Sequence, residues 1–440
     1  MNIIIYIVAF CILTGCVCSN MDRLSKTILV LYLSVWFIAL IISMSGACGL
    51  HQPKESTVAL LLAHVLTFFI GFKLVKIKNK CDIQILHSSL DEQLNALTSS
   101  KVFRVVLIAA FIYVSSMFAI FYQEVAVANA LVDVRNDFYS GELLGSGFSF
   151  LNVYFLIPFQ GFVLAIFGYM SFYKRNWIWG VSGVYIIMYS LLSAGRNEIV
   201  NILLILVFFA LCVGKLSTTK QSKNYIVFVL MILAAYFTMG LLTGNRSGIA
   251  QGNTTLSEGL NETNTHVIAY LGGPVVAFDH ALNSNLVNEC GGYQLGAMTF
   301  AAIDEIVFMG ETVLRKVVET PPRVRAISEI GSYLHDNYID IGTPWRWNAL
   351  YTSCLYYYLD FGIFGVLFLP FIFGILVRLS IKWVYQYRSF LMIVILSIVF
   401  YTLVNTFQRF FLYRMSQLLL LYVLYHYGKK KQYSNKVNKI

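Results

Sequence analysis

Apolar residues occur in long blocks separated by short polar segments, and this pattern predicts an all-helical membrane protein. Each block is close to the roughly 20 residues that cross a bilayer as an α-helix. Eleven such blocks can be distinguished, so we expect about eleven transmembrane helices. They cover residues 2–19, 27–48, 57–75, 102–122, 149–172, 178–195, 199–214, 225–243, 355–377, 389–407 and 410–427.

The same pattern divides the chain into three parts. Residues 1–243 hold the first eight blocks, residues 244–354 form a large polar connection, and residues 355–440 hold three more blocks and a basic tail. In the connection we expect a short helix over 262–284 that is broken at Gly272-Gly273-Pro274. A second, amphipathic helix is expected over 299–319, followed by a polar stretch as far as Asp340. The apolar positions of the helix expected over 299–319 recur at helical spacing: Phe300, Ile303, Val307, Leu314 and Val318.

Composition and charge agree with a membrane protein. The chain is 58% hydrophobic and only 12% charged, whereas a soluble domain has about 25% charged residues. Lys and Arg cluster after alternate blocks, and this bias marks the cytoplasmic side. That side holds 21 of the 32 basic residues and 4 of the 22 acids, which places the amino terminus outside and the carboxyl terminus inside. The net charge of +10 is therefore explained by topology, and no nucleic-acid partner is expected.

Cysteine and histidine give no sign of a cofactor. The eight cysteines form no CxxC pair, and the seven histidines have no metal-binding spacing. We therefore predict neither a disulfide framework nor a metal site. Leu13-Thr14-Gly15-Cys16 resembles a lipoprotein cleavage box, but no Lys or Arg precedes the apolar block, as a signal peptide requires. We interpret residues 2–19 as a membrane span.

Five arginines lie near the outer membrane boundary, where the charge rule does not place them: Arg196, Arg246, Arg346, Arg409 and Arg414. We expect Arg414 to lie about a turn and a half inside the last span. The planar guanidinium group donates two parallel hydrogen bonds and suits phosphate. The set therefore suggests a pocket for a lipid-linked phosphate or diphosphate. The alternative is that each arginine only reaches lipid headgroups.

Three other residues are candidates for acid–base chemistry. Glu198 and Asp360 are the acids closest to the membrane, and each could either act as a base or pair with an arginine. His335 lies in the large outer connection and could accept a proton from a hydroxyl near neutral pH. Its alternative is an ordinary surface histidine. Nearby aromatic residues could stack on sugars or form an interfacial belt: Trp345, Trp347, Tyr356, Tyr357 and Tyr358.

Several short motifs resemble those of the oligosaccharide repeat-unit polymerases of the Wzy type. They are Ser193-Ala-Gly-Arg-Asn-Glu198, the segment Tyr270-Leu-Gly-Gly-Pro-Val-Val-Ala-Phe-Asp279, and Asn348-Ala-Leu-Tyr-Thr352 followed by Asp360-Phe-Gly-Ile-Phe-Gly365. The resemblance covers about residues 190–370, and the number of spans and the one large outer loop are also similar to that family. It implies a GT-C-like membrane glycosyltransferase of the bacterial inner membrane, with a periplasmic amino terminus and a cytoplasmic carboxyl terminus.

The resemblance also implies the reaction and the site. Undecaprenyl-diphosphate-linked oligosaccharide repeat units would be polymerised into O-antigen or another surface polysaccharide at the periplasmic face, with a flippase and a chain-length regulator as partners. From the chemistry of such a reaction, we expect Arg196, Arg246 and Arg409 to stabilise the leaving diphosphate, with His335 as the first candidate for the base and Glu198 or Asp360 as the second. Substrate binding would fall to Arg246, Arg346, Arg409, Arg414, Asp279, Asn348 and Tyr351. No metal and no cofactor is expected.

Two alternative functions remain open. A flippase or transporter of lipid-linked oligosaccharides commonly shows paired halves, and no internal repeat is visible in this sequence. An O-antigen ligase would use a related site but a different acceptor. Asn348 stands at the position where a ligase commonly shows His-Asn, which favours a polymerase.

Overall fold

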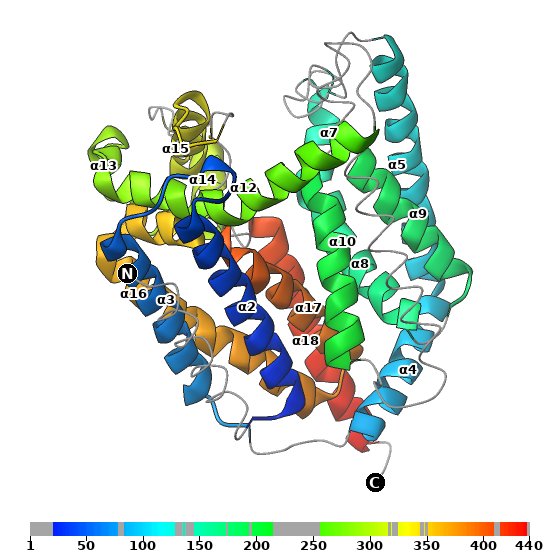
Figure 1. Ribbon diagram of the computed structural model, residues 1–440. Coiled ribbons are helices and arrows are strands. Elements are labelled where there is room, and N and C mark those ends of the chain that lie inside the picture. Colours follow the sequence, from blue (N-terminus) through cyan, green and yellow to red (C-terminus); the bar gives the residue numbers. More distant parts are fainter. Residues whose placement is uncertain are drawn as a thin grey trace. The chain divides into compact units, whose positions relative to one another are not determined.

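The computed structural model is built from helices (Figure 1). It describes residues 21–77, 83–127, 134, 137, 145–172, 175–192, 196–213, 256–315, 318, 324–343, 347, 351–408 and 414–437. Within these ranges the only β-type pairing is an isolated bridge between Ile339 and Trp347. The chain forms two compact units, each assembled from separate stretches of sequence.

The predicted fold class, an all-helical membrane protein, is confirmed for the described residues. Six helices there are long and apolar enough to cross a membrane: Arg23–Ser45, Glu55–Leu74, Lys101–Ala126, Asn152–Phe172, Ser353–Tyr387 and Phe390–Phe407. The expected spans 178–195 and 199–214 correspond to shorter apolar helices, Trp177–Leu192 and Ile199–Leu211. The expected spans 2–19 and 225–243 lie outside the described residues.

The first unit comprises residues 1–80, 266–386 and 402–423. Figure 1 shows its shorter helices gathered at one end, with α2, α3 and α16 extending from them. Its elements are α2 (Arg23–Ser45), η1 (Ala47–Gly49), α3 (Glu55–Leu74), most of α12 (Leu256–Asn283), α13 (Leu286–Glu289), α14 (Ala301–Leu314), α15 (Ala326–Asp336), α16 (Ser353–Tyr387), η4 (Asn405–Phe407) and the first turns of α18 (Met415–Val437).

Helices α3 and α16 cross at two glycines. A Cβ atom on Gly71 would overlap the carbonyl oxygen of Phe371, and one on Gly374 would overlap that of Phe68. Small residues allow backbones this close, and such crossings are a main source of helix association in membranes. The two backbones are therefore in close contact at this crossing.

A buried ion pair joins α16 to the start of α2. Asp22 is the N-cap of α2 and accepts the Ser25 N–H at 3.0 Å. Arg378 of α16 contacts the same carboxylate, with Nη1 3.0 Å from Oδ2, and the Tyr385 hydroxyl donates to Oδ1 at 2.9 Å. All of these partners come from the side that the charge pattern predicts to be cytoplasmic. Removing one partner would leave a buried charge uncompensated, so this pair holds the two helices in register.

The expected break at Gly272-Gly273-Pro274 was wrong, because α12 runs without interruption through Pro274. Proline has no N–H for the carbonyl four residues earlier, which here belongs to Tyr270. The Gln408 side chain donates to that carbonyl, with Nε2 3.4 Å from the oxygen. The glycines serve packing: a Cβ on Gly272 would lie 2.8 Å from Ile42 of α2. The motif is therefore a site of close contact rather than a helix end.

Two further helices were not expected. The predicted polar stretch before Asp340 contains α15, and the predicted cytoplasmic loop before residue 101 contains α4 (Ile83–Ser99). The last predicted span, 410–427, also differs: the helix there, α18, begins at Met415 and not at residue 410, and it is not among the six described helices long and apolar enough to cross a membrane. Arg414 therefore lies immediately before the helix, and the expected position inside it was wrong.

The second unit comprises residues 81–265, 387–401 and 424–440. Helix α8 packs on α9 and α10, and α5 packs on α9. Polar contacts also join helices of this unit. For example, the Tyr169 hydroxyl of α8 donates a hydrogen bond to the Asp91 carboxylate of α4 at 2.8 Å. Its helices are α4, α5 (Lys101–Val127), α7 (Gly145–Leu151), η2 (Asn152–Leu156), α8 (Ile157–Phe172), α9 (Trp177–Leu192), α10 (Arg196–Phe208), η3 (Phe209–Val213) and most of α17 (Phe390–Val404).

Candidate functional site

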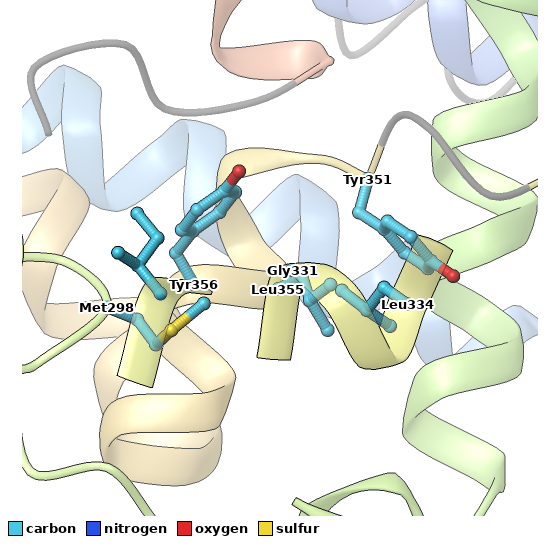
Figure 2. Close-up of a pocket in the computed structure, with 7 residues that line it drawn as sticks. Met298, Gly331, Leu334, Tyr351, Leu355 and Tyr356 are labelled. Atoms are coloured by element: carbon cyan, nitrogen blue, oxygen red, sulfur yellow. The ribbon is translucent and has the colours of Figure 1, made fainter. Parts of the chain in front are cut away.

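A small pocket lies in the first unit between α15, the start of α16 and the segment before α14. Its volume is about 100 Å³, and its lining residues are Met298, Ile327, Gly331, Leu334, Tyr351, Leu355 and Tyr356. Figure 2 shows Met298 and Tyr356 at one side and Tyr351 and Leu334 at the other. Small-molecule sites usually measure about 300–1,000 Å³. This pocket is too small to enclose a sugar repeat unit, so it can accept only part of a larger ligand.

Tyr351, a predicted substrate-binding residue, is buried in the wall of this pocket. Burial raises the pKa of Tyr351 to about 12, with further contributions from Tyr333 and Cys290. The hydroxyl therefore stays protonated at physiological pH and can donate a hydrogen bond. A neutral donor suits a sugar oxygen or a phosphate oxygen better than it suits acid–base chemistry.

Asp360, a predicted base, is fully buried and binds main-chain amides. Its Oδ1 accepts the N–H of Met298 at 3.0 Å, and its Oδ2 accepts the N–H of Thr299 at 2.6 Å. The next two residues, Phe361 and Gly362, form a kink in α16, where Gly362 adopts a φ of 62°. Both carboxylate oxygens are thus engaged in holding the segment that supplies Met298 to the pocket. This geometry gives Asp360 a positioning role.

Asp279, a predicted substrate-binding residue, belongs to α12, and its carboxylate lies beside the amino-terminal end of α3. Its carboxylate accepts the Lys54 N–H at 3.1 Å and the Thr57 hydroxyl hydrogen. Lys54 is the N-cap of α3, and a negative charge is favourable at a helix amino terminus. These contacts join α12 to α3 and explain why a carboxylate stands at this position.

His335, the first candidate for the base, occupies the last turn of α15. Its side chain is exposed, with Nδ1 3.3 Å from Asp336 Oδ1. Leu334, the preceding residue, lines the pocket, so His335 is close in sequence to the pocket but presents its ring to the exterior.

An ion cluster that the sequence did not point out connects α14, α15 and α18. Arg325 directly precedes α15, and its Nη2 lies 3.6 Å from Glu305 Oε2 and donates to the Ala301 carbonyl at 3.1 Å. Its Nε lies 3.9 Å from Asp304 Oδ2. Glu305 also accepts the Met415 N–H at 3.0 Å, at the start of α18. The available signal was the acidic pair Asp304-Glu305 within a segment whose other residues are mainly apolar.

The predicted arginines are described only in part. Arg414 is half-buried and its carbonyl accepts the N–H groups of Gln417 and Leu418, so its main chain caps α18. Arg196 begins α10 in the second unit. Its side chain and that of Glu198 lie outside the described part of the structure, as do residues Arg246, Arg346, Arg409 and Asn348. Of the eleven candidates, the first unit therefore holds five whose side chains are described: Asp279, His335, Tyr351, Asp360 and Arg414.

A buried histidine within the membrane-spanning part is a second feature that sequence reasoning missed. His64 of α3 places Nδ1 3.2 Å from the Val366 carbonyl oxygen and 3.4 Å from Cys354 Sγ. Its ring also packs against Trp36 and Tyr357, with centroids 5.0 Å and 6.0 Å away. An ionisable residue at this depth is a candidate for function by default. Here the ring is enclosed by α2, α3 and α16 and satisfies a helix carbonyl, so it stabilises their packing.

The described residues contain no group of three or more His, Cys, Asp or Glu side chains able to hold a metal ion. No family model, no curated protein and no solved structure matches the chain.

Proposed function

We propose that the protein polymerises undecaprenyl-diphosphate-linked oligosaccharide repeat units at the outer face of a bacterial inner membrane. In this proposal it is a GT-C-like glycosyltransferase with about eleven spans, and residues 244–354 lie on the periplasmic side. Three features support it: the membrane-spanning helices, the arginines that the charge rule does not explain, and the motifs between residues 190 and 370 that resemble the Wzy type.

The position of Arg414 carries the proposal. It directly precedes α18, and the next residue, Met415, donates its N–H to Glu305. The same carboxylate contacts Arg325, so the main chain next to Arg414 is held beside the Arg325 ion cluster. Guanidinium groups held by fixed partners in a partly dehydrated site are suited to a diphosphate. Arg414 or Arg346 would hold the diphosphate of one lipid, while Arg196, Arg246 and Arg409 would bind that of the other.

The proposed reaction is a displacement at an anomeric carbon. A hydroxyl oxygen of the acceptor repeat unit forms the new bond to this carbon, and the bond to the diphosphate oxygen breaks with its electron pair staying on the diphosphate. The acceptor proton passes to a base. We assign His335 this role ahead of Glu198, because Asp360 uses both carboxylate oxygens to bind main-chain N–H groups. Tyr351, Asn348 and Asp279 remain the proposed contacts to the acceptor, contributing mainly proximity.

The test is polymerisation by purified protein in liposomes with a lipid-diphosphate-linked repeat unit. Replacing Arg196 or Arg414 with alanine should abolish long chains at unchanged protein level, and His335→Ala should slow chain growth strongly. Lys316→Ala offers a control change of one charge in the same outer region. Wild-type chain lengths in all three site variants would contradict the proposal. Movement of the lipid between leaflets without bond formation would indicate a flippase, and transfer only to lipid A core would indicate a ligase.

A further inference from the structure

Helix α14 is amphipathic in the opposite sense to a helix on a water-soluble protein. Two of its three acids face the protein interior, where Asp304 is 7% and Glu305 is 4% exposed, and the third, Glu311, is half-buried. Its large apolar side chains face outwards, where Ile303 is 54%, Val313 is 65% and Leu314 is 63% exposed. A helix surrounded by water has the reverse arrangement. The outward face must therefore be covered by something apolar.

The inward polarity is fixed by specific partners. Arg325 lies against both acids, and Glu305 also accepts the Met415 N–H of α18. Rotating α14 to bring the acids outwards would break the contacts with α15 and α18 and leave Arg325 without these carboxylates. These contacts therefore fix the rotation of α14 that turns its apolar face outwards. Between Ala301 and Leu314 the exposed side chains are apolar except that of Thr312, and the neighbouring Glu311 is half-buried.

This face continues the lipid-facing surface of a membrane-spanning helix. A Cβ placed on Gly296 would lie 3.1 Å from Phe300, which precedes α14, and 3.4 Å from Phe361, at the kink of α16. Both rings are exposed, and below the kink α16 continues the exposed apolar surface with Ile363, Phe364 and Phe368. Tyr293, an exposed aromatic residue of the kind favoured at membrane interfaces, packs over Gly362 of the same kink.

We propose that α14 lies in the membrane interface, with its face of Ile303, Ile306, Val307, Val313 and Leu314 in contact with the acyl chains of the outer leaflet. Amphipathic helices bind in this way, with the apolar face buried about 5–10 Å into the boundary between headgroups and acyl chains. The exposed apolar side of α16, a helix long and apolar enough to cross a membrane, suits contact with lipid, and Phe361 and Phe300 connect this surface to that of α14. The segment is thus an interfacial helix rather than part of a water-soluble loop, whatever reaction the protein catalyses.

The test is site-specific photo-cross-linking of the full chain in phosphatidylethanolamine–phosphatidylglycerol vesicles. The photoreactive residue p-benzoylphenylalanine replaces Ile306 or Val313 on the proposed face. It replaces Phe364 as a positive control on α16, and exposed Ser332 of α15 as a negative control. We expect phospholipid adducts, detected by mass spectrometry, at positions 306, 313 and 364 in yields at least about tenfold above position 332, as for a face buried among acyl chains.

Adducts at position 364 without adducts at 306 and 313 would overturn the proposal. Cross-linking of positions 306 and 313 mainly to a second copy of the chain would overturn it as well, because a protein would then cover the face. A second measurement needs no variant: a phospholipid with a diazirine in its acyl chain is incorporated with the unaltered protein. Adducts should map to residues 301–314, and their confinement to the membrane-spanning helices would contradict the assignment.

Discussion

At the scale of single residues, the strongest contacts in the first unit join groups that are far apart in sequence. Asp360 binds amides more than 60 residues away, and Asp22 pairs with Arg378 across 356 residues. The sequence placed Asp360 near the membrane but did not identify its partners, because a one-dimensional pattern carries no information on which distant groups meet. The sequence suggested Asp360 as a base or as a partner of an arginine, and the structure shows two main-chain amides as its partners. Asp279 contacts the Lys54 amide and the Thr57 hydroxyl, and its contact with substrate stays a prediction.

The role of Asp360 gives a first prediction. Asparagine has one acceptor oxygen, so Asp360→Asn would turn an NH₂ group towards one of the two amides. Leaving a buried donor unsatisfied costs about 1–3 kcal/mol, and we expect a lower thermal unfolding midpoint in detergent. Asp336→Asn, at an exposed position on α15, is the control and should leave the midpoint unchanged. Equal midpoints for all three proteins would mean that the carboxylate does not hold the segment before α14.

Cys290 gives a prediction about pH. Burial and the carboxylates of Glu289 and Glu329 raise the pKa of this thiol, so at neutral pH little thiolate is present and alkylation is slow. Removing one charge with Glu329→Gln should lower the pKa, increase the thiolate fraction and speed maleimide labelling of Cys290. The gain should stay below tenfold, the effect of about one pKa unit. Mass spectrometry of the Cys290 peptide measures the rate, and Asp336→Asn serves as the charge-matched control.

A rate of Cys290 labelling that is indifferent to Glu329→Gln at pH 7, or that falls, would refute this electrostatic account. Labelling should also rise with pH in both proteins, because the thiolate is the reactive form.

At the scale of helices, the apolar blocks predicted most of the long helices, while amphipathic and proline-containing segments were less predictable. The hydropathy signal is strong for α2, α3 and α16 because a span of about 20 apolar residues has few other interpretations. Helices α4 and α15 mix polar and apolar residues, and their sequences also fit loops. In α12, the glycine and proline residues suggested a break. The sequence around them gave no sign of the compensating donor, because this donor, Gln408, comes from the far end of the chain.

That compensation can be tested with a double-mutant cycle. Gln408→Leu removes the donor to the Tyr270 carbonyl and should destabilise the protein by about 1 kcal/mol, a usual value for one hydrogen bond. In a Pro274→Ala background, the alanine N–H can bond the same carbonyl, so Gln408→Leu should have a smaller effect. Thermal unfolding of the four proteins gives the coupling. Additive effects would show that Gln408 does not replace the missing helix bond.

At the scale of the whole molecule, charge distribution predicts what the helices alone do not, namely which end of the chain lies on which side. An odd number of spans puts the two termini on opposite sides, and the excess of Lys and Arg after alternate blocks assigns the carboxyl terminus to the cytoplasm. The structure supplies the helices long enough to cross, whereas sidedness depends on insertion and is not encoded in packing. The number of spans and the orientation therefore remain predictions that need a measurement in membranes.

The orientation can be measured in spheroplasts with a membrane-impermeant maleimide. Ser332→Cys on exposed α15 should be labelled in unpermeabilised spheroplasts. The background has Cys48 and Cys290 replaced by serine, because they are partly exposed in the same unit. A fluorescent protein fused after Ile440 should be bright, as expected for a domain folded in the cytoplasm. If Ser332→Cys reacted only after permeabilisation, the outer arginines would face the cytoplasm, where the charge rule already accounts for them. The argument for a diphosphate site would then lose its premise, whereas labelling from outside would leave those arginines in need of an anionic partner.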